Sequence, residues 1–89
     1  MAKTKADDRP VLNVKIFSPF KTFFDGKAYS ISAENKTGAF DILQGHTNFL
    51  TLLVPSICVV ETKTGPLKFQ IDGGVLHVTK DSVVLFLNV

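Results

Sequence analysis

The sequence predicts an all-β fold, a small antiparallel β-sandwich of about seven to ten short strands. Apolar and polar residues alternate in most segments, turn residues recur roughly every eight to twelve positions, and no segment has the period of an amphipathic helix. The 89 residues are enough for one domain. We expect residues 1–10 to form a flexible charged tail and residues 11–89 to form the sandwich.

Turn residues divide the first half of the chain into short extended segments. Ser18-Pro19 ends the first of them, because proline lacks a backbone donor. Asp25-Gly26 is predicted to be a turn, and it is followed by a strand with Tyr29 and Ile31 on one face. Gln44-Gly45-His46 is predicted to be a bend between two strands. The other expected strands of this half are Val11–Phe17, Ala39–Leu43 and Phe49–Val54.

The second half is predicted to contain two hairpins. Lys63-Thr64-Gly65-Pro66 is the expected turn of the first, and Lys80-Asp81 is a two-residue connection in the second. The paired glycines of Asp72-Gly73-Gly74 predict a bulge or a close approach of two backbones, since glycine has no Cβ. The expected strands are Ile57–Thr62, Leu67–Ile71, Val75–Thr79 and Ser82–Leu87.

Two of these strands are apolar on both faces. Val83–Leu87 and Ile57–Val60 contain no polar residue except one cysteine. A sandwich buries one face of each sheet and normally leaves the other polar. The outer side chains of these strands therefore need a second cover, which comes either from another polypeptide or from loops of the same chain.

Composition excludes several classes of function. Ten Lys and Arg residues against eight Asp and Glu residues leave a net charge of +2, too small and scattered for a nucleic-acid footprint. One cysteine excludes an internal disulfide and every metal motif that needs several cysteines, and it fits a reducing compartment. The longest apolar stretch, Phe49–Val60, is interrupted and shorter than the ~20 residues of a membrane-spanning helix. Any association with a membrane is therefore expected to come through a partner.

The residue types that carry catalysis are sparse. Cys58 lies in an apolar run, where burial raises the pKa of a thiol and favours a structural role. His46 and His77 could join Asp41 or Asp72 as metal ligands, but their spacing matches no known ligand motif. The glycines do not form a phosphate-binding loop. We expect no catalytic residue, cofactor or metal ion.

Several separated segments, in their order along the chain, resemble one known family. These segments are Phe24-Asp25-Gly26, Ser30–Ala33, Gly38–His46, Leu50–Pro55, Asp72–Val78 and Ser82–Leu85. Together they resemble the N-terminal β-sandwich of the epsilon subunit of F-type ATP synthases, over nearly the whole chain from about Leu12 to Leu87. The resemblance implies a non-catalytic subunit of the rotating central stalk of a proton- or sodium-translocating enzyme. Such a subunit binds the gamma subunit and the c-ring, contacts the alpha and beta subunits indirectly, and couples ion flow to ATP synthesis as a peripheral protein on the cytoplasmic face of the cell membrane.

The resemblance also implies a set of interface residues. The segment from Gly38 to His46 corresponds to the family's lower loop near the ring and gamma, so Gly38, Ala39, Phe40, Gly45 and His46 are expected at the interface, with Phe40 as a packing residue. Ala39 stands where the family usually carries an acidic residue that faces the ring. His46 has an equally good alternative as a loop histidine that caps a backbone carbonyl.

The family commonly continues into a helical hairpin that can inhibit ATP hydrolysis and in some members binds ATP. Since the sequence ends at Val89, this polypeptide is expected to lack hairpin inhibition and nucleotide sensing. Two other functions stay open. A carbohydrate-binding sandwich would need an exposed aromatic platform, and the sequence offers Tyr29 for it. A small hydrolase would need His46 and Asp41, and the sequence offers no credible nucleophile beside them.

Overall fold

A computed structural model describes residues 10–45 and 48–87, and every regular element in that part of the chain is a β-strand. The predicted all-β class is therefore confirmed, and nine strands fall within the expected number. The strands are β1 (Leu12–Phe17), β2 (Thr22–Ala28), β3 (Ser30–Asn35), β4 (Gly38–Leu43), β5 (Phe49–Leu53), β6 (Ser56–Thr62), β7 (Gly65–Ile71), β8 (Gly74–Thr79) and β9 (Ser82–Leu87). Residues 1–9 of the predicted tail (residues 1–10) and His46 lie outside the described residues.

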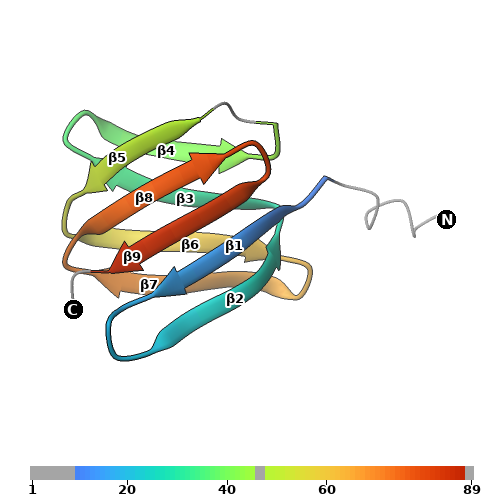
Figure 1. The fold of residues 1–89 in the computed structure, drawn as a ribbon, viewed down its shortest axis with the longest axis horizontal. Helices are drawn as coiled ribbons and strands as arrows, with labels where there is room; N and C mark the ends of the chain where they lie inside the picture. Colours follow the sequence, from blue (N-terminus) through green and yellow to red (C-terminus); the bar gives the residue numbers. More distant parts are fainter. Residues whose placement is uncertain (1–9, 46–47, 88–89) are drawn as a thin grey trace, which may run out of the picture.

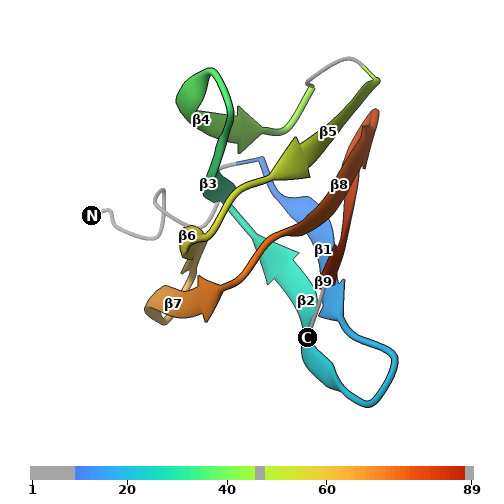
Figure 2. The same cartoon turned by 90° about the vertical axis from the view of Figure 1, so that its left-hand side faces the viewer.

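The strands form one curled sheet that folds into two layers (Figure 1 and Figure 2). The hydrogen-bonded order is β2-β1-β9-β8-β5-β3-β6-β7. The remaining strand, β4, lies outside this order and pairs with β3 along its whole length, from Ser30 opposite Leu43 to Asn35 opposite Gly38. The sheet turns from one layer to the other between β5 and β3, which are joined by one residue pair, Asn35 with Leu53. One layer thus contains β2, β1, β9, β8 and β5, and the other contains β4, β3, β6 and β7.

One pair of strands departs from the predicted antiparallel arrangement. The first and last strands, β1 and β9, run parallel, from Asn13 opposite Ser82 to Phe17 opposite Phe86. Parallel neighbours need a long connection between them. The seven strands that separate β1 from β9 along the chain supply it.

The predicted turn at Asp25-Gly26 is also wrong, because both residues lie inside β2 and pair with Lys15 and Val14 of β1. The hairpin turn comes earlier, where the Ser18 amide donates a hydrogen bond to the Lys21 carbonyl (2.8 Å). Glycine is tolerated within β2 because β2 is an edge strand with only one neighbour.

Two further boundaries differ from the prediction. The turn between β6 and β7 contains only Lys63 and Thr64, and Pro66 lies within β7, opposite Glu61. Proline is tolerated there because β7 is the last strand of the sheet, so the donor that proline lacks is not required. Tyr29 lies at a bend between β2 and β3 rather than in a strand, and its amide donates to the Glu61 carbonyl (2.7 Å).

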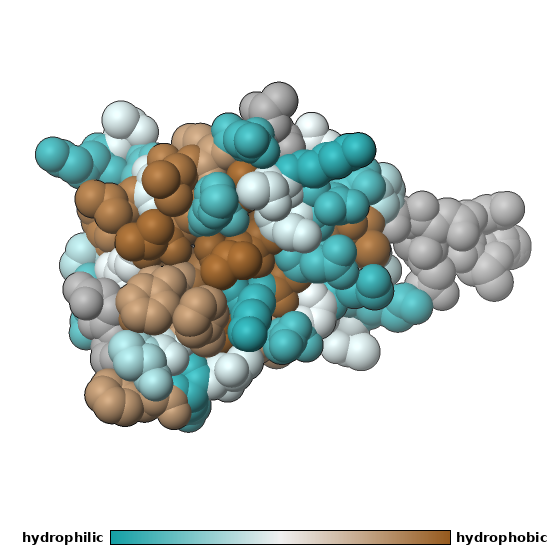
Figure 3. All heavy atoms as spheres, viewed as in Figure 1, coloured by the Kyte–Doolittle hydropathy of each residue, from teal (hydrophilic) through white to brown (hydrophobic). Residues whose placement is uncertain are grey.

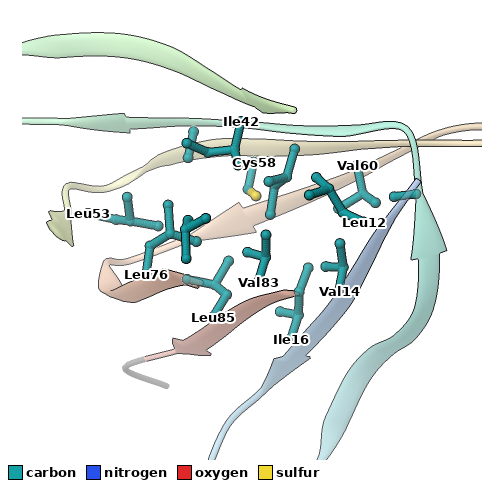
Figure 4. Packing of buried hydrophobic residues seen from close by; sticks show 14 of the residues in the cluster. Leu12, Val14, Ile16, Ile42, Leu53, Cys58, Val60, Leu76, Val83 and Leu85 are labelled. Atoms are coloured by element: carbon teal, nitrogen blue, oxygen red, sulfur yellow. The ribbon is translucent and has the colours of Figure 1, made fainter. Parts of the chain in front are cut away.

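The core lies between the two layers and is almost entirely aliphatic. Figure 4 shows side chains of β8 and β9, such as Leu76 and Leu85, facing Ile42 and Cys58 of the opposite layer. The predicted alternation in β1 is confirmed, since its inward side chains are buried and its outward ones are not. The largest fully buried side chains are Leu12, Val14, Ile16, Ile31, Ile42, Cys58, Val60, Ile71, Leu76, Val78, Val83 and Leu85.

The close approach predicted at the paired glycines is confirmed. Gly73 has a φ of +130°, a conformation that side chains disfavour. A Cβ on Gly74 would stand 2.5 Å from the Phe86 carbonyl oxygen, so only glycine leaves room for β9 there. The two glycines thus allow β8 to begin directly against the end of β9.

Candidate protein-interaction surface

The outer surface of one layer is unusually apolar. We define the outer apolar face as the outward side chains of Phe17, Leu50, Leu52, Val75, Val84 and Phe86. Leu50 is 67% exposed and Leu52 is 70% exposed, while Val75, Val84 and Phe86 are each between 37% and 39% exposed. Figure 3 shows apolar residues gathered over β5, β8 and β9, in the orientation of Figure 1. The described loops of the chain therefore leave this face open.

Strand register aligns these side chains in rows across the sheet, because paired residues point to the same face. The first row contains Leu52 of β5, Val75 of β8, Phe86 of β9 and Phe17 of β1. The second row contains Leu50, His77, Val84 and Lys15, in the same strand order. The third row contains Thr79, Ser82 and Asn13, from β8, β9 and β1. The face therefore changes from wholly apolar to polar along the strands.

An aromatic pair ends the first row. The rings of Phe17 and Phe86 meet edge to face, with centroids 5.2 Å apart and planes at 68°. The Lys15 ammonium lies 5.3 Å from the centroid of the Phe17 ring, within the range of a cation–π contact. One border of the outer apolar face thus carries a positive charge against an aromatic ring.

The outer apolar face is hollowed on both sides of the Leu52–Val75 pair. On one side, a groove of about 400 Å³ lies between this pair and the β3–β4 turn, with Lys36 and Thr37 on its far wall. The turn is held beside β5 by a hydrogen bond of 3.1 Å from the Asn35 amide to the Thr51 hydroxyl. On the other side, a hollow of about 300 Å³ is lined by Leu52, Leu53, Asp72, Gly73, Gly74, Val75 and Phe86. Two adjacent recesses with apolar walls suit the insertion of side chains from a partner protein.

The outer surface of the second layer is more polar. One of its rows contains Asp41, Ser32, Val59 and Lys68, and the Ser32 hydroxyl donates a hydrogen bond of 2.5 Å to the Asp41 carboxylate. Ile57 is 59% exposed on this layer, but its cross-strand neighbour is Gln70. The apolar residues of the second layer therefore do not form a continuous row like the first row of the outer apolar face.

The interface residues expected from the sequence do not form one patch. Gly38 and Ala39 begin β4, whereas Gly45 lies in the turn after β4, and a six-residue strand is about 20 Å long. Phe40 is half-buried, packs against the core and meets the Phe49 ring edge to face at 5.6 Å. The segment from Gly38 to Leu43 is thus a strand between two turns, and His46 is not among the described residues.

Sequence reasoning found part of the outer apolar face and missed the rest. It indicated that the segment Val83–Leu87 is apolar on both faces, and the exposure of Val84 and Phe86 confirms this. It missed Phe17, Leu50, Leu52 and Val75. Leu50 and Leu52 could have been found in the same way as β9, because β5 also contains apolar residues on both faces.

The candidate chemical groups of the sequence do not come together among the described residues. No group of three His, Cys, Asp or Glu side chains comes together among residues 10–45 and 48–87. Cys58 is fully buried, and burial raises the pKa of its thiol to about 11. Tyr29 is only 8% exposed and therefore offers no sugar-stacking platform. The same part of the chain contains no helix of the length and apolarity needed to cross a membrane.

Comparison with known proteins identifies the family. Residues 11–88 match the β-sandwich domain of the ATP synthase delta/epsilon chain. The chain belongs to this family. This agrees with the resemblance seen in the sequence and with the sandwich found in the structure.

The similar curated proteins are ATP synthase epsilon chains. The chain is 36% identical over 86 residues to that of Clostridium novyi, covering 96% of this chain and 60% of that protein. It is 30% identical over 77 residues to that of Ruminococcus albus, covering 86% of this chain and 58% of that protein. For Micrococcus luteus the identity is 37% over 75 residues, covering 83% of this chain and 82% of that protein. The chain thus spans about 60% of the length of the first two relatives.

Two solved structures share the fold. One is a chain of the Euglena gracilis mitochondrial ATP synthase assembly of OSCP, F1 and c-ring (TM-score 0.81, 21% identity, 86% of this chain and 50% of that chain). The other comes from the central stalk and c-ring of the Tetrahymena thermophila mitochondrial ATP synthase (TM-score 0.72, 19% identity, 85% of this chain and 62% of that chain). Because the sequence identities are only 21% and 19%, the structural similarity to these two chains supports the β-sandwich fold alone.

Proposed function

We propose that the chain is a non-catalytic central-stalk subunit of a proton- or sodium-translocating F-type ATP synthase, and that it couples ion flow to ATP synthesis by binding the gamma subunit and the c-ring. The observation that carries this proposal is the outer apolar face. A rotor subunit needs a large contact that does not slip, and burial of apolar surface contributes about 25 cal/mol per Å² to such a contact. Membership of the delta/epsilon family supports the same function.

The outer apolar face is the proposed docking surface for gamma. Its first row offers four apolar side chains in register, and the recesses beside Leu52 and Val75 offer places for anchoring residues of the partner. The doubly apolar strand β9 is then covered by another polypeptide, which is one of the two alternatives that its sequence left open.

The c-ring contact is proposed at the β3–β4 turn and the start of β4, which include Gly38 and Ala39. This turn borders the groove that Leu50 and Leu52 line, so the ring contact and the gamma contact would be adjacent. Gly45 and His46 follow the opposite end of β4 and are proposed to contact gamma separately. The chain would be held at the cytoplasmic face of the membrane through these subunits, with the alpha and beta subunits contacted indirectly.

A pair of charge substitutions tests the proposed docking surface. Leu52→Asp places a carboxylate at the β5 end of the first row, between the two recesses of the outer apolar face, and Ile57→Asp places one on the outer surface of the other layer. Both side chains are exposed in the free domain, so both variants are expected to fold with nearly the wild-type melting temperature. Leu52→Asp should weaken binding to the cognate gamma subunit at least tenfold, because burying an unpaired carboxylate is costly. Ile57→Asp should bind like the wild type.

The binding assay is combined with purification of the tagged protein from its native membranes. Recovery of the gamma and c subunits with the wild type, and their loss with Leu52→Asp alone, is the expected result. A wild-type protein that recovers none of the stalk subunits would refute the assignment to the motor. Equal losses for the two variants would refute the assignment of gamma to the outer apolar face.

A further inference from the structure

A histidine interrupts the outer apolar face. His77 projects from β8 in the second row, and its cross-strand neighbours on that face are Leu50 of β5 and Val84 of β9. Its neighbours on the same face of β8 are Val75 and Thr79. The imidazole is exposed in the free domain, directly beside the apolar first row. A partner that covers the first two rows would therefore remove this imidazole from water.

No charged group faces His77 from the two adjacent strands. β5 and β9 contain no Asp, Glu, Lys or Arg residue. The nearest charge in the second row is Lys15, two strands away and therefore about 10 Å distant, and it is opposite Asp25 of β2. Lys80 and Asp81 belong to the turn at the end of β8, beyond the third row. Within the part of the chain that the structure describes, no carboxylate is positioned beside the imidazole to stabilise its protonated form.

We propose that His77 makes the docking of gamma on the outer apolar face sensitive to pH, so that the complex forms with a neutral imidazole and weakens when the imidazole takes up a proton. This inference rests on the proposed function and adds regulation to the same surface. A buried imidazole is easily tolerated when neutral, whereas burial of the charged form without a counter-charge is costly.

The direction of the effect follows from the chemistry of imidazole, which changes its charge between pH 5 and 8. If only the neutral form docks, affinity falls as the pH drops from 7.5 to 5.5. We expect about tenfold weaker binding at pH 5.5 than at pH 7.5, because burial of the charged form beside Leu50 and Val84 without a counter-charge is costly. Acidification would loosen the subunit from gamma while leaving the fold of the domain intact.

The test compares His77 with an exposed residue on the outer surface of the second layer, Lys68. Affinity for the cognate gamma subunit is measured by calorimetry at pH 7.5, 6.5 and 5.5 for the wild-type full chain, His77→Gln and Lys68→Gln. Glutamine retains a polar side chain but does not titrate in this range. The wild type and Lys68→Gln should lose about tenfold in affinity at pH 5.5, and His77→Gln should lose less than twofold.

The outcomes separate this inference from the proposed function. A wild-type affinity that does not change with pH, or that rises at pH 5.5, overturns the role of His77 and leaves the docking of gamma in place. An equal loss for wild type and His77→Gln likewise assigns the pH response to other groups and overturns the inference. Failure of the wild type to bind gamma at pH 7.5 overturns the proposed function and this inference together.

Discussion

Replacing Gly74 with alanine is expected to destabilise the domain, because two strands that together carry half of the outer apolar face touch at this residue. A Cβ at position 74 would lie 2.5 Å from the Phe86 carbonyl oxygen and 3.3 Å from the Leu87 Cα. Both neighbours are backbone atoms of the paired strand β9, so no flexible side chain can move aside. Gly74 also pairs with Leu53 of β5, so a shift of β8 away from β9 would press it against the strand on its other side.

The expected loss follows from the cost of overpacking. Forcing an additional methyl group against a well-packed backbone costs about 1–3 kcal/mol. Alanine offsets at most about 1 kcal/mol of this by reducing the entropy of the unfolded chain. A net loss of about 1–2 kcal/mol lowers the melting temperature of a domain of this size by about 4–16 °C.

The assay is thermal and urea unfolding of Gly74→Ala beside a matched control, Gly26→Ala. Both glycines lie in strands, but a Cβ on Gly26 would meet only the Phe24 ring, at an ordinary contact distance of 3.5 Å. The control should therefore remain within about 0.5 kcal/mol of the wild type. If both variants melt at the wild-type temperature, then β8 and β9 do not approach each other as closely as described. The pairing of Val75 with Phe86 would then also be wrong.

The substitutions Gly45→Val and Cys58→Ala, together with a pH titration of stability, each test a different part of the structure. Gly45→Val should cost about 1 kcal/mol or more, because Gly45 has a φ of +89°, which valine strongly disfavours, and an unchanged melting temperature would show that this turn is wrongly described. Burial of the Cys58 thiol predicts that the contribution of this group to stability is constant below pH 9 and declines between pH 9 and about 11, because the folded state retains the thiol proton that the unfolded state releases there. This decline should be reduced in Cys58→Ala relative to the wild type, and an equal decline in both would contradict it.

The sequence by itself determined the strands and most of their turns, because these depend on residues close together in the chain. Alternation of apolar and polar side chains predicted the inward face of β1, and the two-residue connection at Lys80-Asp81 predicted the last hairpin. The glycines at 73 and 74 predicted a close backbone approach for the same local reason. The exposure of Val84 and Phe86 was also predictable, because side chains on the two opposite faces of one strand cannot both point into the same core.

The tertiary structure alone decided how these strands combine. The parallel pairing of β1 with β9 joins the first strand to the last, and no local sequence pattern encodes it. The alignment of Leu52 with Val75, and of Val75 with Phe86, depends on the register of three strands. That register places a histidine between two apolar side chains, and the length of β4 separates Gly38 from Gly45. A strand period specifies which face a side chain takes, but only the hydrogen bonds between distant strands specify what lies beside it.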